Sequence, residues 1–225
     1  MNATSDESLR CALDQGVDAL VLSLDTAQKE KLLAYLALIS KWTQVYNLTA
    51  VRDPADMLTH HLLDSLAVVK PLLSQLAVLQ INRTGLKLLD VGSGAGLPGI
   101  VVAICCPDIT VHCVDTVAKK AAFIQQVAAS LKLSNLRGIH ARVESLTDTY
   151  DVICSRAFAS LENFTKWSIQ ALAAQGVWMA MKGKHPADEM TALPPEVQVF
   201  HVKQLLVPGL DAERCVVWMR PSLVD

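Results

Sequence analysis

Closely spaced glycines make the clearest candidate for a binding site in this sequence. They follow the apolar run 88–91 and are Gly92, Gly94, Gly96 and Gly99. Glycines permit a tight turn and let a ligand approach the backbone closely. The apolar, helix-like run that comes next offers unpaired backbone N–H groups in its first turn. The pattern therefore predicts a ligand held between the end of a strand and the start of a helix.

The spacing of these glycines fits two classes of cofactor. Gly94, Gly96 and Gly99 alone spell G-x-G-x-x-G, the dinucleotide pattern, which is weak without context. Counted from Gly92, which comes straight off the strand, the pattern is D-x-G-x-G-x-G and resembles motif I of the S-adenosylmethionine-dependent methyltransferases. Asp90 before the glycines suits a cationic cofactor and is unfavourable beside a pyrophosphate. A glycine-rich turn without any ligand is the remaining alternative.

A second acid ends the next strand-like run, 110–115. An acid in this place can accept hydrogen bonds from both ribose hydroxyl groups of a nucleoside. The alternative is a surface acid that caps the helix after it. Asp115 therefore supports nucleoside binding without choosing between the two cofactors.

Basic residues follow the ends of three later strand-like runs. They are Arg142, Arg156, Lys182 and Lys184. Because ligands of open α/β sheets bind outside the carboxyl ends of the strands, we expect these residues beside the glycine loop. Any one of them is more often a solvated loop charge, but four at one edge suit a phosphate-bearing substrate.

The elements that position these residues are of two kinds. Residues 1–85 show helical periodicity, with Asp25 as the N-cap of a helix that runs to about Tyr46 and Asp53-Pro54 opening another. From residue 86, strands and helices alternate, which predicts a parallel sheet with helices on both faces. We therefore predict a helical N-terminal extension over 1–85 and a methyltransferase domain over 86–225.

The last two strand-like runs differ from this alternation. They cover 197–207 and 215–220 and have no helix between them, which predicts an antiparallel hairpin. The predicted fold class is thus α/β: a Rossmann-like, mostly parallel seven-stranded sheet with an antiparallel terminal hairpin, as in S-adenosylmethionine-dependent methyltransferases.

Composition restricts where such a protein works. The 225 residues are 52% hydrophobic and 19% charged, which gives a buried core and no sign of disorder. Unbroken apolar runs end well before 18 positions, and residues 1–16 lack the apolar core of a signal peptide, so we expect no membrane association. The scattered cysteines fit reduced thiols in the cytoplasm, and the net charge of −2 leaves any nucleic-acid contact to a local patch.

The segment 153–158, at the end of the fourth strand-like run (150–155), restricts the atom that is methylated. It lacks the Asp/Asn-Pro-Pro-aromatic tetrapeptide with which many methyltransferases hold an exocyclic amine. Cys154 stands where cytosine-C5 enzymes carry their nucleophile, but no proline precedes it and we expect it to face the core. A target that is already nucleophilic remains, such as guanine N7. It has no proton to lose, so alignment does most of the work and no general base is required.

Several segments along the chain share motifs with one family. They are Trp42–Thr49, Arg52–Pro54, His61–Leu66, Asp90–Gly99 and Ser155–Leu161. Together they resemble the bacterial small-subunit rRNA (guanine-N7)-methyltransferase G family, also called glucose-inhibited division protein B, from about residue 20 to 220. The resemblance implies that S-adenosyl-L-methionine is the cofactor and that the N7 of a guanine in the 530 loop of 16S rRNA is methylated. It also implies 16S rRNA or the small ribosomal subunit as partner, and we expect a cytoplasmic monomer.

The resemblance assigns residues to the site. Its cofactor contacts, together with the loop glycines and the second acid, give the predicted cofactor-binding residues Gly92, Gly94, Gly96, Leu97, Asp115, Val143, Glu144 and Arg156. Basic positions that face RNA in the family, together with the basic edge, give the predicted RNA-contacting residues Arg142, Lys182, Lys184 and Arg214. Arg156 is the best candidate for a residue near the target base.

The helical motifs suggest two further hypotheses. His60, His61 and Asp64 have a spacing compatible with a metal site, but no further ligands accompany them, so we favour a helix-face role and expect no metal. The segment Asn47–Thr49 and Arg52 are interpreted as a loop that folds over the edge of the cofactor.

Two other functions stay open from the residues alone. One is an NAD-dependent Rossmann oxidoreductase, which cofactor-binding measurements would distinguish. The other is an RNA-binding assembly factor that holds the cofactor without catalysis, which methyl transfer to rRNA would distinguish.

Overall fold

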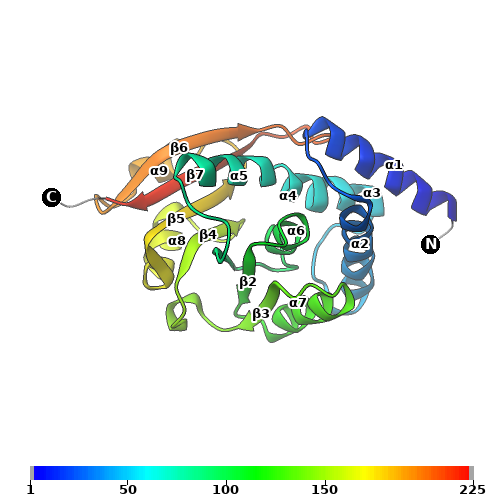
Figure 1. Ribbon diagram of the computed structural model, residues 1–225, viewed down its shortest axis with the longest axis horizontal. Helices are drawn as coiled ribbons and strands as arrows, with labels where there is room; N and C mark the ends of the chain where they lie inside the picture. Colours follow the sequence, from blue (N-terminus) through cyan, green and yellow to red (C-terminus); the bar gives the residue numbers. More distant parts are fainter. Residues whose placement is uncertain (1–2, 223–225) are drawn as a thin grey trace.

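The computed structural model describes residues 3–222, which contain one mixed sheet between Lys87 and Pro221. Residues 1–2 and 223–225, at the ends of the two predicted regions, lie outside the described residues. The strand order is β3-β2-β1-β4-β5-β7-β6 (Figure 1). The strands are β1 (Lys87–Val91), β2 (Thr110–Asp115), β3 (Leu136–His140), β4 (Tyr150–Arg156), β5 (Leu172–Lys182), β6 (Val197–Leu205) and β7 (Arg214–Pro221). β1 to β5 are parallel, while β7 pairs antiparallel with both β5 and β6. The predicted parallel sheet with an antiparallel hairpin is confirmed.

Helices precede the sheet and alternate with its strands. Those before it are α1 (Ala3–Ala19), α2 (Thr26–Tyr46), α3 (Pro54–Met57), the π-helix η1 (Leu58–Leu63), α4 (Asp64–Leu66) and α5 (Val69–Val78). Those within it are α6 (Gly99–Cys105), α7 (Ala118–Ser130), the 3-10 turns η2 (Val143–Ser145) and η3 (Ile169–Ala171), α8 (Leu161–Ser168) and α9 (Ala187–Thr191). The short α9 between β5 and β6 was not predicted. It is a single acidic turn with no buried residue, so hydrophobic periodicity gives no signal for it.

The two predicted helix starts are confirmed in atomic detail. The Asp25 carboxylate accepts from the backbone N–H of Gln28, whose side chain binds back to the Asp25 backbone in a capping box. The Asp53 carboxylate accepts from the N–H groups of Ala55 and Asp56, with proline at the first helical position. These caps satisfy orphan donors and therefore set where α2 and α3 begin.

The sheet buries two hydrophobic layers, one on each face. Adjacent residues of a strand contribute to opposite layers, as Leu88 and Leu89 do in β1. The larger layer packs the sheet against the helices before β1 and against α6 and α7, while the smaller layer includes Leu161 and Phe164 of α8. Figure 1 shows α2 standing beside α7 at one end of the molecule, and the two helices are in contact.

The helices before β1 are integral to this core. They end at Val78 and the first strand begins at Lys87, so helix gives way to strand near residue 85. Leu32, Tyr35 and Ile39 of α2 are fully buried in the same layer as the β-strand side chains. The helical segment 1–85 and the segment 86–225 therefore share one core. Their division into an extension and a domain remains a proposal.

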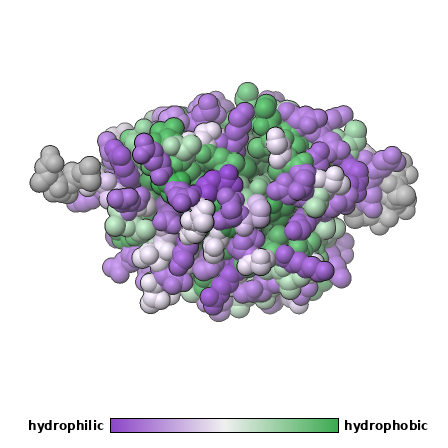
Figure 2. All heavy atoms as spheres, viewed as in Figure 1, coloured by the Kyte–Doolittle hydropathy of each residue, from purple (hydrophilic) through white to green (hydrophobic). Residues whose placement is uncertain are grey.

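One helical stretch among the described residues, Pro54–Val78, could cross a membrane by its length and its mean hydropathy of 1.2. Polar residues interrupt the apolar residues of this stretch, so it contains no unbroken apolar run. The fold buries 67% of the apolar window, which is the arrangement of a core helix. Figure 2 shows that hydrophilic residues cover most of one face of the molecule, with apolar residues visible between them.

Candidate functional site

The glycine loop joins β1 to α6 and turns sharply. Gly92, Gly94 and Gly96 have φ angles of +64°, +58° and +89°, a region in which a side chain is strained. A Cβ on Gly92 would lie 2.1 Å from Cδ2 of Phe158, so the ring and the loop backbone are in direct contact. Only glycine fits this position without displacing the ring.

Asp90 supports the loop from behind. Its side chain is fully buried, and its Oδ2 accepts from the backbone N–H of Gly99 at 2.9 Å. Burial raises the pKa of this carboxyl group to about 7. The carboxyl group is not among the residues that line the two cavities described below, and its Oδ1 is buried without a hydrogen-bond partner, so the interpretation that it suits a cationic cofactor stays a prediction. Asp90 holds the first turn of α6 in place.

A first cavity of about 380 Å³, here called the nucleoside cavity, lies beyond the ends of β1, β2 and β3. Asp115 is 94% buried on its wall, and its carboxylate accepts from the N–H groups of Gly94 at 3.0 Å and Val117 at 2.8 Å. The acid therefore supports the glycine loop and caps the chain before α7. Each oxygen keeps a lone pair for a further donor such as a ribose hydroxyl. Val143 and Glu144 line the same cavity.

A second cavity of about 560 Å³, here called the transfer cavity, lies on the other side of the loop. Gly92, Gly94, Leu97 and Arg156 line it, together with Leu48 and Thr49 from the helical segments. The two cavities have three residues in common, Gly92, Lys120 and Ala157. They therefore form one site with two compartments that meet over the first glycine.

Three basic side chains from neighbouring strands border the transfer cavity: Arg156, Lys182 and Arg214. Arg156 ends β4, Lys182 ends β5, and Arg214 begins the antiparallel β7, so all three lie at one edge of the sheet. Arg156 Nη1 donates to Asp64 Oδ2 at 2.7 Å, and Arg214 Nε donates to Asp64 Oδ1 at 2.9 Å. One carboxylate from the helical segment thus binds two of the three cations.

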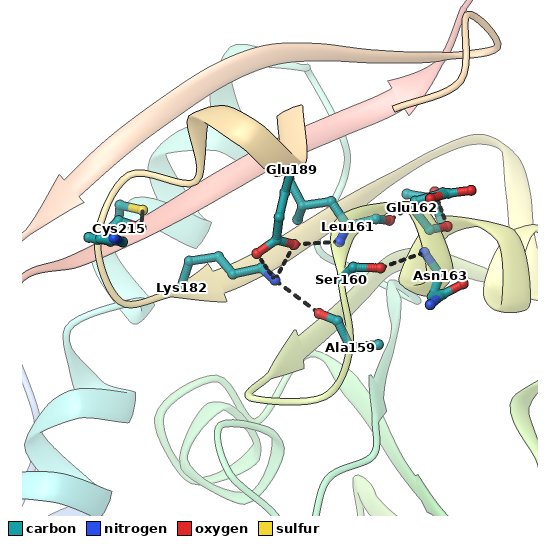
Figure 3. Close-up of polar contacts among 10 residues, drawn as sticks. Ala159, Ser160, Leu161, Glu162, Asn163, Lys182, Glu189 and Cys215 are labelled. Carbon is teal, nitrogen blue, oxygen red and sulfur yellow. Dashed lines mark hydrogen bonds and ion pairs between the residues drawn. The ribbon is translucent and has the colours of Figure 1, made fainter. Parts of the chain in front are cut away.

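The third cation has its own partner (Figure 3). Lys182 Nζ lies 2.7 Å from Oε2 of Glu189 on α9 and donates to the carbonyl oxygen of Ala159 at 2.9 Å. Glu189 also accepts from the N–H of Leu161, beside Ser160, which caps α8 through the N–H of Asn163. Through Glu189, the unpredicted α9 therefore contacts both the end of β5 and the start of α8.

Some predicted site residues lie elsewhere. Gly96 lines neither cavity, because its backbone packs against Ile100 of α6. Arg142 lines the nucleoside cavity and is not beside the other predicted RNA-contacting residues. Lys184 is exposed and lines neither cavity. Arg52 donates to the Thr43 carbonyl and to Asn47 Oδ1, so it caps the end of α2, while the loop residues after Asn47 reach the transfer cavity.

Other residues of the site were not singled out from the sequence. Lys120 lies between the compartments, with its Nζ 3.6 Å from Asp115 Oδ2. Phe158 and Trp167 give the nucleoside cavity an aromatic wall, with ring centroids 5.8 Å apart. Phe158 belongs to the family-like motif Ser155–Leu161, but no role of its own could be assigned to it from the sequence. Its contact with Gly92 places it in the site. His61 is 93% buried on the transfer cavity, with Nε2 2.9 Å from Thr49 Oγ1.

The two compartments fit an S-adenosyl group. The nucleoside cavity supplies carboxylates and an aromatic wall, which suit a ribose and an adenine ring. In the transfer cavity Ser93 Oγ is buried without a hydrogen-bond partner, so a polar group is available to a ligand there. The space beside Gly94 is open, because a Cβ would meet only the Gly92 carbonyl oxygen, at 4.0 Å. Among the described residues no group of His, Cys, Asp and Glu side chains is arranged to hold a metal ion.

The sheet order with its reversed last pair, together with a loop-centred site, defines the fold of the S-adenosylmethionine-dependent methyltransferases. TrmN from Thermus thermophilus superposes with a TM-score of 0.53 at 20% identity, covering 67% of this chain and 48% of that one. Coclaurine N-methyltransferase bound to N-methylheliamine and S-adenosylhomocysteine gives a TM-score of 0.50 at 13% identity, covering 90% of this chain and 73% of that one. At these identities the likeness shows the fold alone.

Sequence comparison identifies the family. Residues 28–217 match the family described as rRNA small subunit methyltransferase G. Ribosomal RNA small subunit methyltransferase G of Polaromonas naphthalenivorans is 65% identical over 97% of this chain and 99% of its own length. The protein of the same name from Albidiferax ferrireducens is 66% identical over 96% of this chain and 99% of its own. The chain belongs to the rRNA small subunit methyltransferase G family.

Proposed function

We propose that the protein transfers a methyl group from S-adenosyl-L-methionine to the N7 of a guanine in the 530 loop of 16S rRNA. The observation that carries the proposal is the continuous site over Gly92, with a nucleoside cavity on one side and a basic cavity on the other. Its relatives are named as small-subunit rRNA methyltransferases. The dinucleotide alternative has no support from the family or from these structural relatives.

The nucleoside cavity is proposed to hold the cofactor. Asp115 and Glu144 face the space as hydrogen-bond acceptors, and Phe158 offers a flat apolar surface. When bound, S-adenosylmethionine supplies an electrophilic methyl group on a positively charged sulfur. Gly92 lies where the two compartments meet and lets a ligand approach the backbone, because it carries no side chain.

The transfer cavity is proposed to receive the target guanine and its phosphates. Arg156, Lys182 and Arg214 border it from three strands, and Lys120 lies at its junction with the nucleoside cavity. Guanidinium and ammonium groups are the usual partners of nucleic-acid phosphates. The proposed roles of Arg142 and Lys184 in RNA binding rest on their charge and on their place near the same sheet edge.

No proton has to be removed from guanine N7, so the residues act by alignment and exclusion of water. Burial lowers the pKa of His61, and the nearby Arg156 lowers it further, so this side chain is neutral near pH 7. A neutral His61 adds no positive charge to the transfer cavity, where a positively charged methyl donor is proposed to meet its target.

The test is methyl transfer from tritiated S-adenosylmethionine to three RNA forms: free 16S rRNA, an assembly intermediate and mature small subunits, all lacking this methyl group. Label is expected in one of them, and aniline cleavage after borohydride reduction, which is specific for 7-methylguanosine, should map it to the 530 loop. Cofactor binding without label in any form would leave only a cofactor-binding assembly factor. Label on another base atom would refute the N7 assignment.

We also propose that the protein works as a monomer in the cytoplasm. The expectation rests on the mixed surface and the free cysteines. Sedimentation of the purified chain, alone and with the small subunit, measures the oligomeric state directly.

A further inference from the structure

Asp64 is an unusual group at the transfer cavity because it is an acid in a site proposed to receive RNA. It follows the π-helix η1, and its N–H donates to the carbonyl oxygens of Thr59 and His61. The Asp64 side chain is 4% exposed. π-helical turns are rare and occur frequently at functional sites. A buried carboxylate is costly unless it is paired, so its partners determine what it does.

Asp64 has two cationic partners: Arg156, which is predicted to bind the cofactor, and Arg214, which is predicted to contact RNA. Each carboxylate oxygen accepts from one of them, Arg156 at 2.7 Å and Arg214 at 2.9 Å. Arg156 Nη1 also donates to the backbone oxygen of His60 at 2.9 Å. The two guanidinium groups come from β4 and β7, which are separated by β5. Without an anion between them these cations would repel each other and move apart.

The other acid near these cations, Glu189, pairs with a different one. Glu189 pairs with Lys182 and with the N-terminus of α8 (Figure 3). Asp64 is the one acidic side chain that lines the transfer cavity among the described residues. Arg156 and Arg214 therefore have no other carboxylate within hydrogen-bond distance there.

We infer that Asp64 is a positioning residue, which fixes Arg156 and Arg214 so that the target guanine is aligned for methyl transfer. The inference rests on the proposed function and extends it to a residue that acts through its two arginine partners. Both guanidinium groups keep N–H donors that Asp64 does not use. These donors are available to a phosphate or to the guanine O6.

Positioning and simple charge balance predict different methylation rates when the charge of Asp64 is removed. If Asp64 only neutralised the arginines, Asp64→Asn would strengthen RNA binding and leave the methylation rate unchanged, because an acid near phosphates is unfavourable. If Asp64 positions them, the same variant binds rRNA as tightly as the wild type or more tightly, yet reacts more slowly at saturating RNA. Displacing an aligning group by about 1 Å can cost up to about 100-fold in rate.

The experiment measures kcat and KM for the RNA form that the wild type methylates, with the full-length chain. We expect Asp64→Asn to lower kcat at least tenfold while the KM for RNA stays equal or falls. The matched control is Asp56→Asn, which removes an exposed acid of the same helical stretch that has no ion pair, and it should stay within twofold of the wild type. A kcat of Asp64→Asn within twofold of the wild type overturns the inference.

A second set of variants separates positioning from folding. The double variant Arg214→Met/Asp64→Asn should lower kcat by less than the product of the two single losses, because both changes remove the contact between Asp64 and Arg214, while only Asp64→Asn also frees Arg156. Fully multiplicative losses would overturn the inference. If Asp64→Asn does not fold, Asp64→Glu keeps the charge and shifts the arginines by one methylene, and it should lower kcat at unchanged thermal stability. A wild type that methylates none of the RNA forms would refute the proposed function, whereas variant effects against an active wild type test Asp64 alone.

Discussion

Gly92→Ala tests whether the first loop glycine is required both by its backbone and by the ring beside it. An alanine at a φ of +64° costs about 1–2 kcal/mol relative to glycine. Its Cβ would lie 2.1 Å from Phe158 Cδ2, and overpacking of this kind adds about 1–3 kcal/mol. The expected loss in free energy of unfolding is therefore about 2–5 kcal/mol.

Gly94→Ala is the matched control in the same loop. Its φ of +58° gives the same backbone strain, but the nearest atom to its Cβ would be 4.0 Å away. The expected loss is about 1–2 kcal/mol, from the backbone alone. Urea unfolding of the purified variants without cofactor measures both values.

A double-mutant cycle isolates the contact with the ring. Phe158→Ala removes the atoms that the new methyl group would meet, so Gly92→Ala in that background should lose only its backbone cost. The coupling between the two positions should be about 1–3 kcal/mol. Equal losses for Gly92→Ala and Gly94→Ala, with coupling below about 0.5 kcal/mol, would refute the steric argument. Calorimetry with S-adenosylhomocysteine should show weaker binding to Gly92→Ala, because the displaced ring lines the nucleoside cavity.

Three further measurements test single groups. Burial raises the folded-state pKa of Asp90 from 3.8 to about 7. Because the folded state then binds a proton that the unfolded state has lost, the free energy of unfolding of the wild type should fall from about pH 4 to pH 7 and then level off. Asp90→Asn should lack this fall, and urea unfolding that gives wild type and variant the same pH dependence would contradict the prediction. Asp115→Ala should lower the free energy of unfolding by about 1 kcal/mol, because the hydrogen bond from the Val117 N–H is lost. If a ribose hydroxyl donates to Asp115, the same variant should bind S-adenosylhomocysteine about tenfold more weakly, and an unchanged affinity in calorimetry would exclude that hydrogen bond. Arg214→Met should reduce the salt dependence of rRNA binding by about one unit of log–log slope; an unchanged slope in filter binding would mean that Arg214 contacts no phosphate.

Local chemistry in the sequence was enough to predict most of the fold. The caps at Asp25 and Asp53 and the turn glycines act on neighbouring residues, so their positions could be read directly. Strand ends followed from apolar runs, and the reversal of β7 followed from a connection without a helix. Boundaries were less accurate where the chain changes type gradually, as where α8 passes through η3 into β5 at Leu172.

The site was predictable where charge and strand ends coincide, as for Asp115 and Arg156. It was not predictable where a partner comes from a distant segment. Asp64 pairs with arginines 92 and 150 residues away, and no local pattern encodes such a contact. The burial of Asp90 was not predictable for the same reason, because it depends on the packing of α6 against the end of β1.

The reversed strand β7 has a consequence for how the enzyme is made. Arg214 and Asp64 are 150 positions apart, the longest sequence separation among the side-chain hydrogen bonds of the described residues. Contacts of this kind form late, because the ends of a long loop must first be brought together. During synthesis the glycine loop and its nucleoside cavity can form while β7 is still inside the ribosome. The proposed cofactor cavity can thus form before the proposed RNA-binding side is complete, because that side includes Arg214 of β7.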